Sequence, residues 1–320
     1  MDSLCSWLYL CLLCPCSYSL HSKGSLYYQT NDFIYLGRNP SDSFIYCRAA
    51  SYEAISPLMR AKTLIKSALY PLYEKRLLAK LDLSRTPRHI AVILDGNRRW
   101  AKENPSLNGD TSSAHGHRAG ASKIIELLTW CEQTDINVVT LWLLSSDNLK
   151  RSPQELDSLM QIIGSSVESL GDTGRWSIKV LGSLELLPER LQEQLKRIEQ
   201  ESAGIAGLKV NVAIGYGGRL EIVDAVKSYL DSAKSSGKDI TQIRDELTVN
   251  SLDQYLYTAG QPDPELVIRT SGEQRLGGFL LWQSHQSEFY FCEAYWPDFR
   301  RVDFLRALRS YSLRQRRLGK

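Results

Sequence analysis

The sequence predicts an α/β protein with a central, mostly parallel sheet flanked by helices. Three observations favour this fold class. Short apolar runs alternate along the chain with longer helical patterns, as in parallel sheets whose strands are joined by helices. The 320 residues suffice for a large core. Their 43% hydrophobic and 23% charged residues are typical of a globular protein, which excludes collagen-like, coiled-coil and wholly disordered chains.

The net charge argues against one class of partner. The chain has 39 lysines and arginines against 36 aspartates and glutamates, which gives a formal charge of +3. This surplus is too small to predict a surface that coats nucleic acid. We therefore expect no nucleic-acid partner and only local anion binding.

Residues 1–56 are expected to be a leader, processed or disordered, that precedes the folded domain. Five of the seven cysteines lie in the first 47 residues, which does not suit a disulfide framework. The CxxC of Cys11 and Cys14 has no second pair of ligands at zinc-site spacing. The longest apolar stretch there, residues 7–14, is far shorter than the roughly 20 residues of a membrane-spanning helix. No transmembrane segment is therefore expected.

The same segment predicts a cellular destination. It lacks the basic start of a secretory signal, because Lys23 is its first lysine or arginine. Its many serines and few charges favour an organellar transit peptide, although Asp2, Asp32 and Asp42 balance the few basic residues. We expect import into plastids (chloroplasts), with the cytoplasm or the surface of the endoplasmic reticulum as alternatives.

Residues 57–81 carry leucines at near-helical spacing among lysines and arginines. This pattern predicts an amphipathic helix that Pro71 kinks or divides. A basic helix of this kind can lie on a membrane surface. We expect it to pack on its own domain with its basic face in water, and peripheral membrane contact is the alternative.

Five apolar, β-branched runs predict the strands of the sheet. The strands are expected at 89–95, 138–145, 176–182, 208–216 and 266–271. The helices are expected at 118–134, 153–170, 187–202 and 219–235. The second of these helices opens with Ser152 and Pro153, which suits a helix N-terminus. Because neither a repeat nor a low-complexity linker interrupts the pattern, residues 57–320 are expected to form one domain.

The first predicted strand leads into a group of candidate functional residues. Ligands of an open parallel sheet bind beyond the carboxyl ends of its strands, and this strand continues as Asp95-Gly96-Asn97-Arg98-Arg99-Trp100. A carboxylate, a glycine that admits a close ligand, an amide and two guanidinium groups suit a magnesium-bound phosphate. The alternative is a turn followed by the solvated start of a basic helix.

Similar chemistry recurs at three other places in the chain. Gly116-His117-Arg118-Ala119-Gly120 is expected where a loop enters a helix, a position that favours anions. The second strand ends in residues 145–151 and the fifth in residues 269–275, and both ends are rich in hydroxyls and basic side chains. Arginines that converge from separate loops fit two phosphate-bearing ligands better than one. The sequence contains no P-loop, dinucleotide fingerprint or hydrolase elbow.

At these residues the chain resembles the cis-prenyltransferase family, also called the undecaprenyl diphosphate synthase family. The resemblance runs from about His89 to the C-terminus and keeps the order of the family's motifs. These motifs stand here as HIAVILDGNRRWAK, GHRAG, LLSSDNLKRSPQEL, VNVAIGYGGR, VIRTSGEQRLGGFLLWQ and EFYFCEAYWPDF. Their details look most like the short-chain branch, the Z,E-farnesyl diphosphate synthases.

The resemblance implies an enzyme that extends an allylic diphosphate primer with isopentenyl diphosphate, forms a cis double bond and releases pyrophosphate. It implies Mg²⁺ as the cofactor, a fold with an apolar product tunnel, and a homodimer. A product in the C10 to C15 range is favoured. The alternatives are a long-chain polyprenyl or dehydrodolichyl diphosphate synthase, a non-catalytic partner subunit of such an enzyme, and a lipid-binding protein of membrane surfaces.

The resemblance also implies roles for single residues. Catalytic roles fall on Asp95, Asn97, Ser145 and Asn148. The allylic diphosphate is expected at Gly96, Asn97, Arg98, Arg99, Trp100 and His117. Isopentenyl diphosphate is expected at Arg151, Arg269, Arg275, Gly277, Arg317 and Gly319. The metal is expected at Asp95 and Glu288, with Glu288 acting within its own subunit or across the dimer.

The product tunnel is expected between the sheet and helix 153–170. The residues that would bound it are Leu159, Ile162, Ile163, Val167 and Leu170. The alternative for each of them is ordinary core packing.

The chain departs from the family pattern at several positions. Ser113 stands where an arginine is common, as in the short-chain branch, while Leu144 and Leu149 replace aromatic residues. Gly277 replaces a serine that binds phosphate in many members. A backbone N–H would then have to take over that contact.

Overall fold

The computed structural model describes residues 19–20, 45–46 and 70–314. The chain divides into two compact units, Met1–Leu69 and Tyr70–Lys320. In the first unit, β1 (Ser19–Leu20) and β2 (Ile45–Tyr46) form a short antiparallel pair. Most of the predicted leader and the first part of the predicted 57–81 helix lie outside the described residues.

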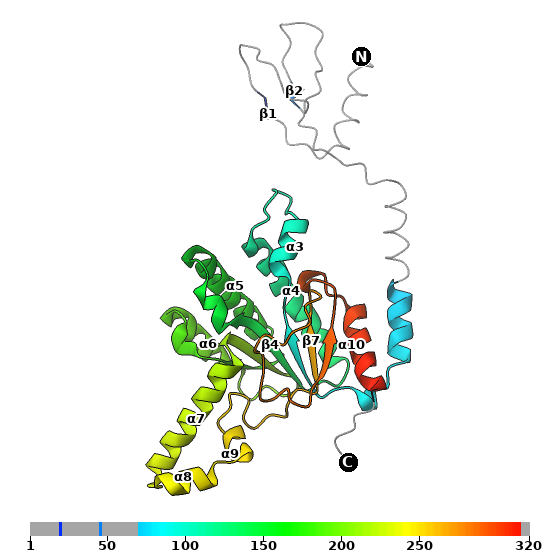
Figure 1. Cartoon of the computed structure of the whole chain (residues 1–320). Coiled ribbons are helices and arrows are strands. Elements are labelled where there is room, and N and C mark those ends of the chain that lie inside the picture. Colours follow the sequence, from blue (N-terminus) through cyan, green and yellow to red (C-terminus); the bar gives the residue numbers. More distant parts are fainter. Residues whose placement is uncertain (1–18, 21–44, 47–69, 315–320) are drawn as a thin grey trace, which may run out of the picture. The chain divides into compact units, whose positions relative to one another are not determined.

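The second unit is built on a six-stranded sheet in which every neighbouring pair of strands runs parallel (Figure 1). The strand order is β5-β6-β4-β3-β7-β8. The strands are β3 (His89–Ile93), β4 (Val138–Ser145), β5 (Ser177–Leu181), β6 (Lys209–Tyr216), β7 (Leu266–Arg269) and β8 (Glu288–Phe291). The five predicted strands are confirmed, and β8 is an additional edge strand.

Helices connect most of these strands. The α-helices with assigned bounds are α3 (Asn97–Glu103), α4 (Ser113–Glu132), α5 (Pro153–Asp172), α6 (Glu189–Ser202), α7 (Gly218–Ser235), α8 (Ile240–Glu246), α9 (Val249–Asp253) and α10 (Arg301–Leu313). The predicted helices correspond to α4, α5, α6 and α7. The helices α3, α8, α9 and α10 are additional to those predicted.

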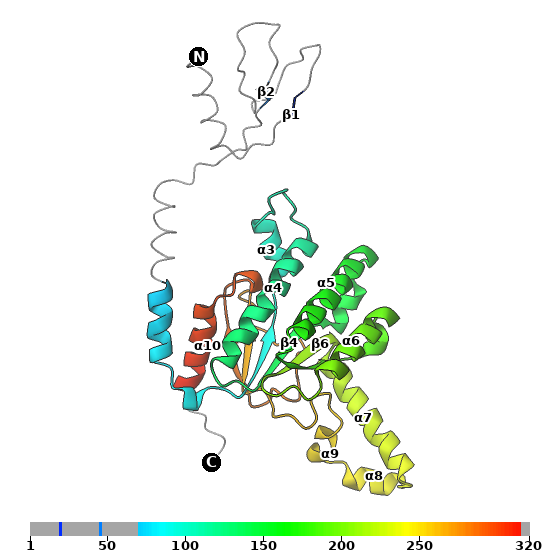
Figure 2. The ribbon, with the colours of Figure 1, turned by 180° about the vertical axis from the view of Figure 1, so that it is seen from behind.

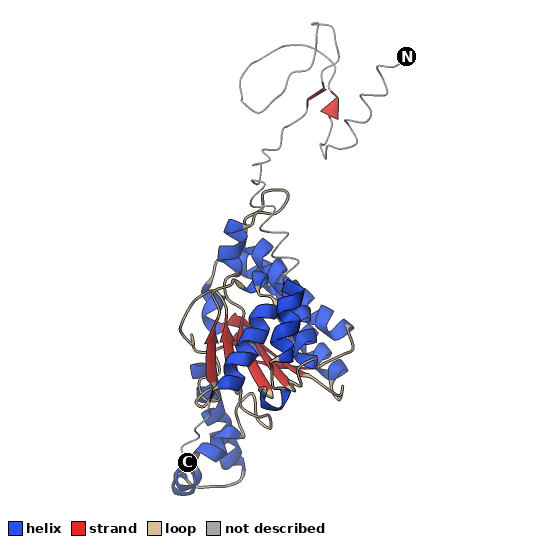
Figure 3. Ribbon diagram, turned by 90° about the vertical axis from the view of Figure 1, so that its right-hand side faces the viewer, coloured by secondary structure: helices blue, strands red, loops and turns tan. Residues whose placement is uncertain are grey.

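Two apolar clusters cover the two faces of the sheet. Alternate residues of β3 show the division, because Ile90 and Val92 join the larger cluster and Ala91 and Ile93 the smaller one. The larger cluster packs the sheet against α4, α5, α6 and α10. The smaller one faces a loop that contributes the buried Phe279. Helices therefore cover one face of the sheet and loop residues pack on the other; Figure 3 shows the helices beside the strands.

Residues 70–81 are the described part of the predicted 57–81 helix, and residues 70–79 are helical. They belong to the second unit and pack on the rest of it, since Leu77 and Leu81 belong to the larger cluster. The Arg300 guanidinium lies over the Tyr70 ring, 4.8 Å from its centroid. The expected packing on the domain is thus confirmed for these residues. No helix in the part of the chain that the structure describes combines the length and apolarity needed to cross a bilayer.

The segment from α7 to α9 leads away from the sheet (Figures 1 and 2). We call residues 218–253 the α7–α9 arm. Several of its apolar side chains face solvent. They are Val223, Leu230, Ile240, Leu247 and Val249.

Candidate functional site

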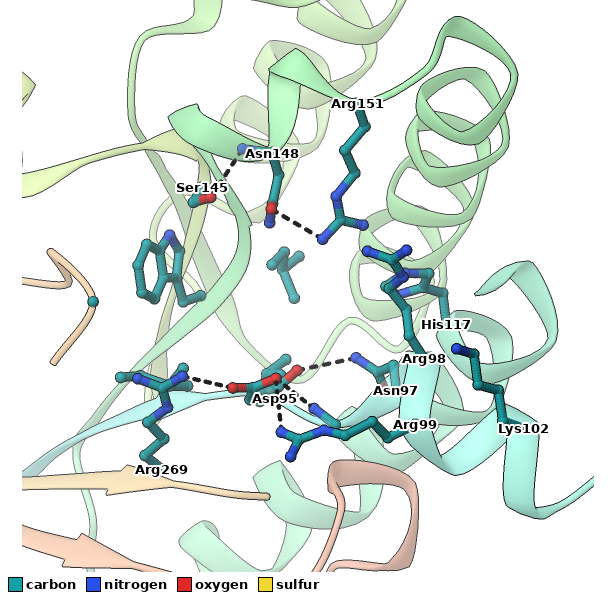
Figure 4. A pocket seen from close by; sticks show the side chains of 16 residues that line it. Asp95, Asn97, Arg98, Arg99, Lys102, His117, Ser145, Asn148, Arg151 and Arg269 are labelled. Atoms are coloured by element: carbon teal, nitrogen blue, oxygen red, sulfur yellow. Dashed lines mark hydrogen bonds and ion pairs between the residues drawn. The ribbon is translucent and has the colours of Figure 1, made fainter. Parts of the chain in front are cut away.

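One cavity of about 490 Å³ lies at the carboxyl ends of β3, β4 and β7 (Figure 4). Its volume is within the range of small-molecule sites, roughly 300–1,000 Å³. The structure brings together there most of the residues singled out in the sequence. They are Asp95, Gly96, Asn97, Arg98, Arg99, His117, Ser145, Asn148, Arg151, Arg269 and Gly277.

Asp95 stands in the turn between β3 and α3. Its Oδ2 accepts a hydrogen bond from Arg269 Nη2 at 2.7 Å, and its Oδ1 accepts one from the Gly96 N–H at 2.7 Å. Gly96 adopts a φ of 104°. A Cβ at this position would lie 2.8 Å from Tyr295 and 3.0 Å from Ser271. Both the conformation and the available space therefore require glycine.

α3 and α4 approach closely because two glycines of α4 face Asn97. A Cβ at Gly116 would lie 2.0 Å from the Asn97 carbonyl oxygen, and one at Gly120 would lie 2.3 Å from Asn97 Oδ1. Asn97 Nδ2 donates to the Leu94 carbonyl at 3.0 Å, whereas Oδ1 is buried without a partner. Buried polar atoms are normally paired, and this amide oxygen instead packs against the backbone of Gly120, which fixes the Asn97 side chain between the two helices.

His117 lies inside α4, which corrects the expected loop-to-helix junction at residues 116–120. The helix begins earlier because the Ser112 hydroxyl accepts a hydrogen bond from the His115 N–H at 3.2 Å and caps it. Burial, reinforced by the Arg151 guanidinium, lowers the pKa of His117 to about 4. The ring is therefore neutral at pH 7, and its Nε2 is buried without a partner. It can hydrogen-bond a ligand without adding charge.

A chain of hydrogen bonds fixes the residues that follow β4, across the cavity from Asp95 (Figure 4). Ser145 Oγ accepts from the Asn148 N–H at 3.1 Å, and Asn148 Oδ1 accepts from Arg151 Nη2 at 2.9 Å. Arg151 Nη1 donates to Glu155 Oε1 at 3.0 Å. These contacts hold the Ser145 hydroxyl, the Asn148 amide and the Arg151 guanidinium in one arrangement.

Arg269 and Gly277 form the wall beside Asp95. Arg269 Nη1 donates to the Arg275 carbonyl, while its Nε is buried without a partner. Gly277 adopts a φ of 66°, and a Cβ there would lie 3.5 Å from Trp142 and 3.6 Å from Arg269 Nη1. A serine would thus fit the space but strain the backbone, which accounts for the glycine at this departure from the family pattern.

Two predicted site residues lie near the cavity but do not line it. Trp100 is on α3, and its ring packs against His115 with 5.3 Å between the centroids. Arg275 follows β7 and directs its guanidinium to Glu273, with 3.0 Å between Nη1 and Oε2.

Glu288 is not brought to Asp95 within the described subunit. It is the first residue of β8 and pairs in register with Leu266, the first residue of β7, so it lies at the end of the sheet opposite the cavity. Its carboxylate pairs with Arg314. Arg317 and Gly319 lie outside the described residues.

The cavity wall also contains residues that the sequence analysis did not single out. They are Ile93, Leu94, Lys102, Trp142 and Leu143. Lys102 was predictable from its spacing, because it follows Arg98 and Arg99 by one helical turn and so lies on the same face of the helix. Trp142, which stacks on Phe279 with 5.0 Å between the ring centroids, looks like any other apolar residue of a strand.

The cavity wall is strongly cationic. The basic lining residues are Arg98, Arg99, Lys102, Arg151 and Arg269. Asp95 is the one carboxylate among the lining residues of this described cavity. This charge suits a ligand that carries more than one phosphate.

Asp95 also bears on the expected metal. Among the described residues, no group of three or more His, Cys, Asp or Glu side chains could hold a metal ion. Mg²⁺ is commonly held by only one or two protein carboxylates, with phosphate oxygens and water as its other ligands. The single carboxylate of Asp95 in a phosphate-attracting cavity therefore fits Mg²⁺ bound together with a diphosphate.

A second, apolar pocket of about 40 Å³ adjoins the cavity and lies next to α4 and α5. The two share the lining residues Leu94, Asn97, His117 and Leu143. Three of the expected tunnel residues line this pocket: Leu159, Ile162 and Ile163. Val167 and Leu170 are buried core instead. The pocket is narrow, because one water molecule takes up roughly 30 Å³ in the liquid.

Comparison with known proteins gives concordant matches. Residues 93–319 match the family model of undecaprenyl diphosphate synthases. A (2Z,6E)-farnesyl diphosphate synthase of Thermobifida fusca is 54% identical over 256 residues, which is 80% of this chain and 99% of that protein. Isoprenyl transferase 1 of Streptomyces avermitilis is 51% identical over 261 residues, which is 82% of this chain and all of that protein.

A solved structure has the same fold. The crystal structure of lavandulyl diphosphate synthase from Lavandula x intermedia, in complex with dimethylallyl diphosphate, matches with a TM-score of 0.68 and 33% identity. The match covers 74% of this chain and all of that structure.

Proposed function

Since the chain belongs to the undecaprenyl diphosphate synthase family, we propose that it is a cis-prenyltransferase that condenses isopentenyl diphosphate with an allylic diphosphate primer. One observation carries the proposal. A single cavity brings Asp95 and five basic side chains next to an apolar pocket. Diphosphate groups thus have cationic partners in the cavity, and a hydrocarbon tail can enter the apolar side once the pocket of about 40 Å³ widens.

The reaction breaks the bond between C1 of the primer and its diphosphate oxygen. It joins C1 to C4 of isopentenyl diphosphate and removes a proton from C2 of that molecule. Negative charge grows on the departing pyrophosphate, and the guanidinium groups of Arg98 and Arg99 can stabilise it without reorganisation. Two diphosphates held in one cavity also keep C1 beside C4, so positioning supplies much of the acceleration.

The remaining residues are assigned to substrate binding and proton removal. Arg269 and Arg151 are proposed to hold isopentenyl diphosphate on the two sides of the cavity. Ser145 and Asn148, fixed by their shared hydrogen bond, are proposed to position its carbon chain and to assist loss of the C2 proton. Mg²⁺, when bound at Asp95, would neutralise charge on the diphosphates.

The product is proposed to be short, in the C10 to C15 range. The bulky side chains of Leu159, Ile162 and Ile163 border the apolar pocket, which supports early termination. The name of the Thermobifida fusca relative, a (2Z,6E)-farnesyl diphosphate synthase, supports the same product class.

The full chain should be incubated with Mg²⁺, labelled isopentenyl diphosphate and one primer at a time: dimethylallyl, geranyl or farnesyl diphosphate. Chromatography should show a C10 or C15 cis product. A ladder beyond about fifty carbons would instead favour a long-chain polyprenyl or dehydrodolichyl diphosphate synthase. A protein that gives no product with any primer would favour a non-catalytic partner subunit.

We also propose that the enzyme is a homodimer. The exposed apolar side chains of the α7–α9 arm, among them Ile240 and Val249, support an interface there. The proposal further gives Glu288, Arg317 and Gly319 a role in the neighbouring subunit's site. An Asp95→Ala subunit mixed with an Arg317→Ala subunit should then recover activity that neither has alone, and mixing without recovery would contradict the shared site.

The leader is proposed to be a plastid transit peptide. The composition of residues 1–56 supports this proposal, while the bacterial relatives give it no support. Residues 1–56 fused to a fluorescent protein should carry it into plastids of plant cells. Diffuse fluorescence in the cytosol would contradict the proposal.

A further inference from the structure

Five residues form a closed ring of polar contacts beside the cavity. Arg269 pairs with Asp95 at 2.7 Å, and the Arg99 guanidinium lies 3.9 Å from the same carboxylate. Arg99 Nη1 lies 3.5 Å from Glu273 Oε1, and Arg275 Nη1 lies 3.0 Å from Glu273 Oε2. The Arg275 carbonyl accepts a hydrogen bond from Arg269, which completes the ring.

Glu273 is the one member of this ring to which neither the resemblance nor the proposed reaction gives a role. Its two carboxylate oxygens contact an arginine of the allylic side, Arg99, and an arginine of the acceptor side, Arg275. The carboxylate thus offsets the electrostatic repulsion between the two guanidinium groups, which are assigned to the binding of different substrates.

The two arginines depend on Glu273 to different degrees. Arg99 has other anchors, because Nη2 donates to Ser271 Oγ at 2.7 Å and lies near Asp95. The Arg275 side chain is 70% exposed, and Glu273 is its ion-pair partner within residues 70–314. Without that partner, the positive charge of the cavity would push Arg275 toward solvent.

We propose that Glu273 is a positioning residue that holds Arg275 at the mouth of the cavity, next to Arg99, ready for the diphosphate of isopentenyl diphosphate. The inference rests on the proposed function. It assigns Glu273 no contact with substrate, because Glu273 does not line the cavity and acts through Arg275.

Glu273→Gln should raise the KM for isopentenyl diphosphate about three- to fivefold, the size expected from an exposed ion pair. The kcat at saturating substrate should change little, because the reacting atoms are untouched. The KM for the allylic primer should change less, since Arg99 keeps Ser271 and Asp95. Glu273→Asp, which restores the charge, should recover part of the loss.

A matched control is Glu293→Gln. The Glu293 carboxylate lies next to Gly272, the residue before Glu273, but forms no ion pair among the described residues. Its kinetics should match the wild type. An unchanged KM in Glu273→Gln, or an equal rise in Glu293→Gln, would overturn the proposal.

A double-mutant cycle tests whether Glu273 acts through Arg275. Arg275→Ala should raise the KM for isopentenyl diphosphate by itself, and adding Glu273→Gln to it should cause less than about a further 1.5-fold rise. Fully additive effects would show that Glu273 acts on something other than Arg275.

Calorimetric titration with inorganic pyrophosphate separates this inference from the proposed function. Glu273→Gln should bind pyrophosphate more weakly than Glu293→Gln and the wild type, whether or not any primer is turned over. If the wild type makes no product but this difference is seen, the proposed function fails and the role of Glu273 in diphosphate binding stands. If all three bind equally, the positioning role fails.

Discussion

At the scale of single residues, Arg269 shows how this protein keeps a buried cation. The residue is 6% exposed, and burying a guanidinium group is costly unless an anion compensates it. Asp95 supplies that anion from one side, but the Arg269 Nε remains without a partner. A bound diphosphate would complete its hydrogen bonding, which agrees with the isopentenyl diphosphate role that the resemblance implies for Arg269.

Arg269→Ala should therefore raise the KM for isopentenyl diphosphate by about 10- to 100-fold. This range corresponds to the roughly 1.5–3 kcal/mol of a hydrogen bond to a charged group. The KM for the allylic primer should rise less. Steady-state kinetics in which each substrate is varied in turn measure both constants.

Arg244→Ala is the control for this substitution. Arg244 lies on α8 with a side chain that is 73% exposed, and its ion pair is with the adjacent Asp245. Both KM values should stay at the wild-type level. An Arg269→Ala enzyme with an unchanged KM for isopentenyl diphosphate would refute the assigned role.

The site residues that the sequence could predict are those whose chemistry suits a diphosphate and whose position is at the end of a predicted strand. Arg269 is the last residue of β7 and Asp95 follows the end of β3 by two residues, and the carboxyl ends of parallel strands meet at one edge of a sheet. Glu273 could not be recognised in the same way. Its role depends on which two arginines the fold brings to its two oxygens, and loop geometry decides that.

At the scale of elements, the crossing of α3 and α4 sets the shape of the site. The Gly120 carbonyl accepts a hydrogen bond from Trp296 Nε1 at 2.7 Å. A Cβ on Gly120 would lie 2.3 Å from Asn97 Oδ1 and 2.8 Å from Trp296 Cδ1. The second glycine of the GHRAG motif thus serves helix packing, and through it the placement of Asn97.

Gly120→Ala should lower the free energy of unfolding by about 1–3 kcal/mol, the usual cost of overpacking. On a solvent-exposed helix face the same change would stabilise the protein by about 1 kcal/mol. The contact with Asn97 therefore decides whether the free energy of unfolding rises or falls. The kcat should also fall, because Asn97 must move. Urea unfolding and steady-state kinetics measure the two effects.

Gly171→Ala on α5 is the matched comparison. Its Cβ would lie 3.1 Å from a methyl group of Ile198, a side chain that can adjust, and Gly171 is not among the residues that line the cavity. Stability should change little and activity not at all. A Gly120→Ala protein as stable and active as this variant would contradict the packing argument.

Elements were predictable where their pattern is continuous. The four interior strands and β5 show apolar, β-branched runs. The edge strand β8 does not, because its residues are only partly buried or exposed, and α3 is too short and polar to show a period. α10 does carry helical spacing at Val302, Leu305 and Leu308, and this spacing is sufficient to predict a helix.

At the scale of the whole molecule, His89 ties together parts of the chain that are distant in sequence. It is fully buried. Its Nδ1 donates to the Pro262 carbonyl at 2.6 Å, and its Nε2 accepts from the Thr140 hydroxyl at 2.8 Å. Burial lowers the pKa of His89 to about 4 from an ordinary value of 6.5, so the folded protein keeps this ring neutral.

Stability should therefore fall as the pH drops. The unfolded chain takes up the His89 proton near pH 6.5 and the folded protein only near pH 4, so acid favours unfolding across that window. Between pH 7 and pH 5 this residue should account for about 2 kcal/mol of lost unfolding free energy. Urea unfolding at both pH values measures the loss.

His89→Gln provides the comparison, because glutamine does not titrate in this range. The variant should be less stable at pH 7 but should lose about 2 kcal/mol less than the wild type between pH 7 and pH 5. Contributions from carboxylates and from His117 are common to both proteins and cancel. Equal losses in the two proteins would rule out the His89 assignment.

The strand order has a consequence for how the protein is made. β3 lies between β4 and β7 in the sheet, and Asp95 and Arg269 are 174 positions apart in the chain. When the ribosome has synthesised β3 through β6, two parts are therefore still missing: β7, which pairs with β3, and Arg269, the counter-ion of Asp95. Because pairing of such distant segments closes late, the partly synthesised chain carries an incomplete sheet and no assembled cavity. The cavity is complete only when the last sixth of the polypeptide, from β7 onward, has joined the rest.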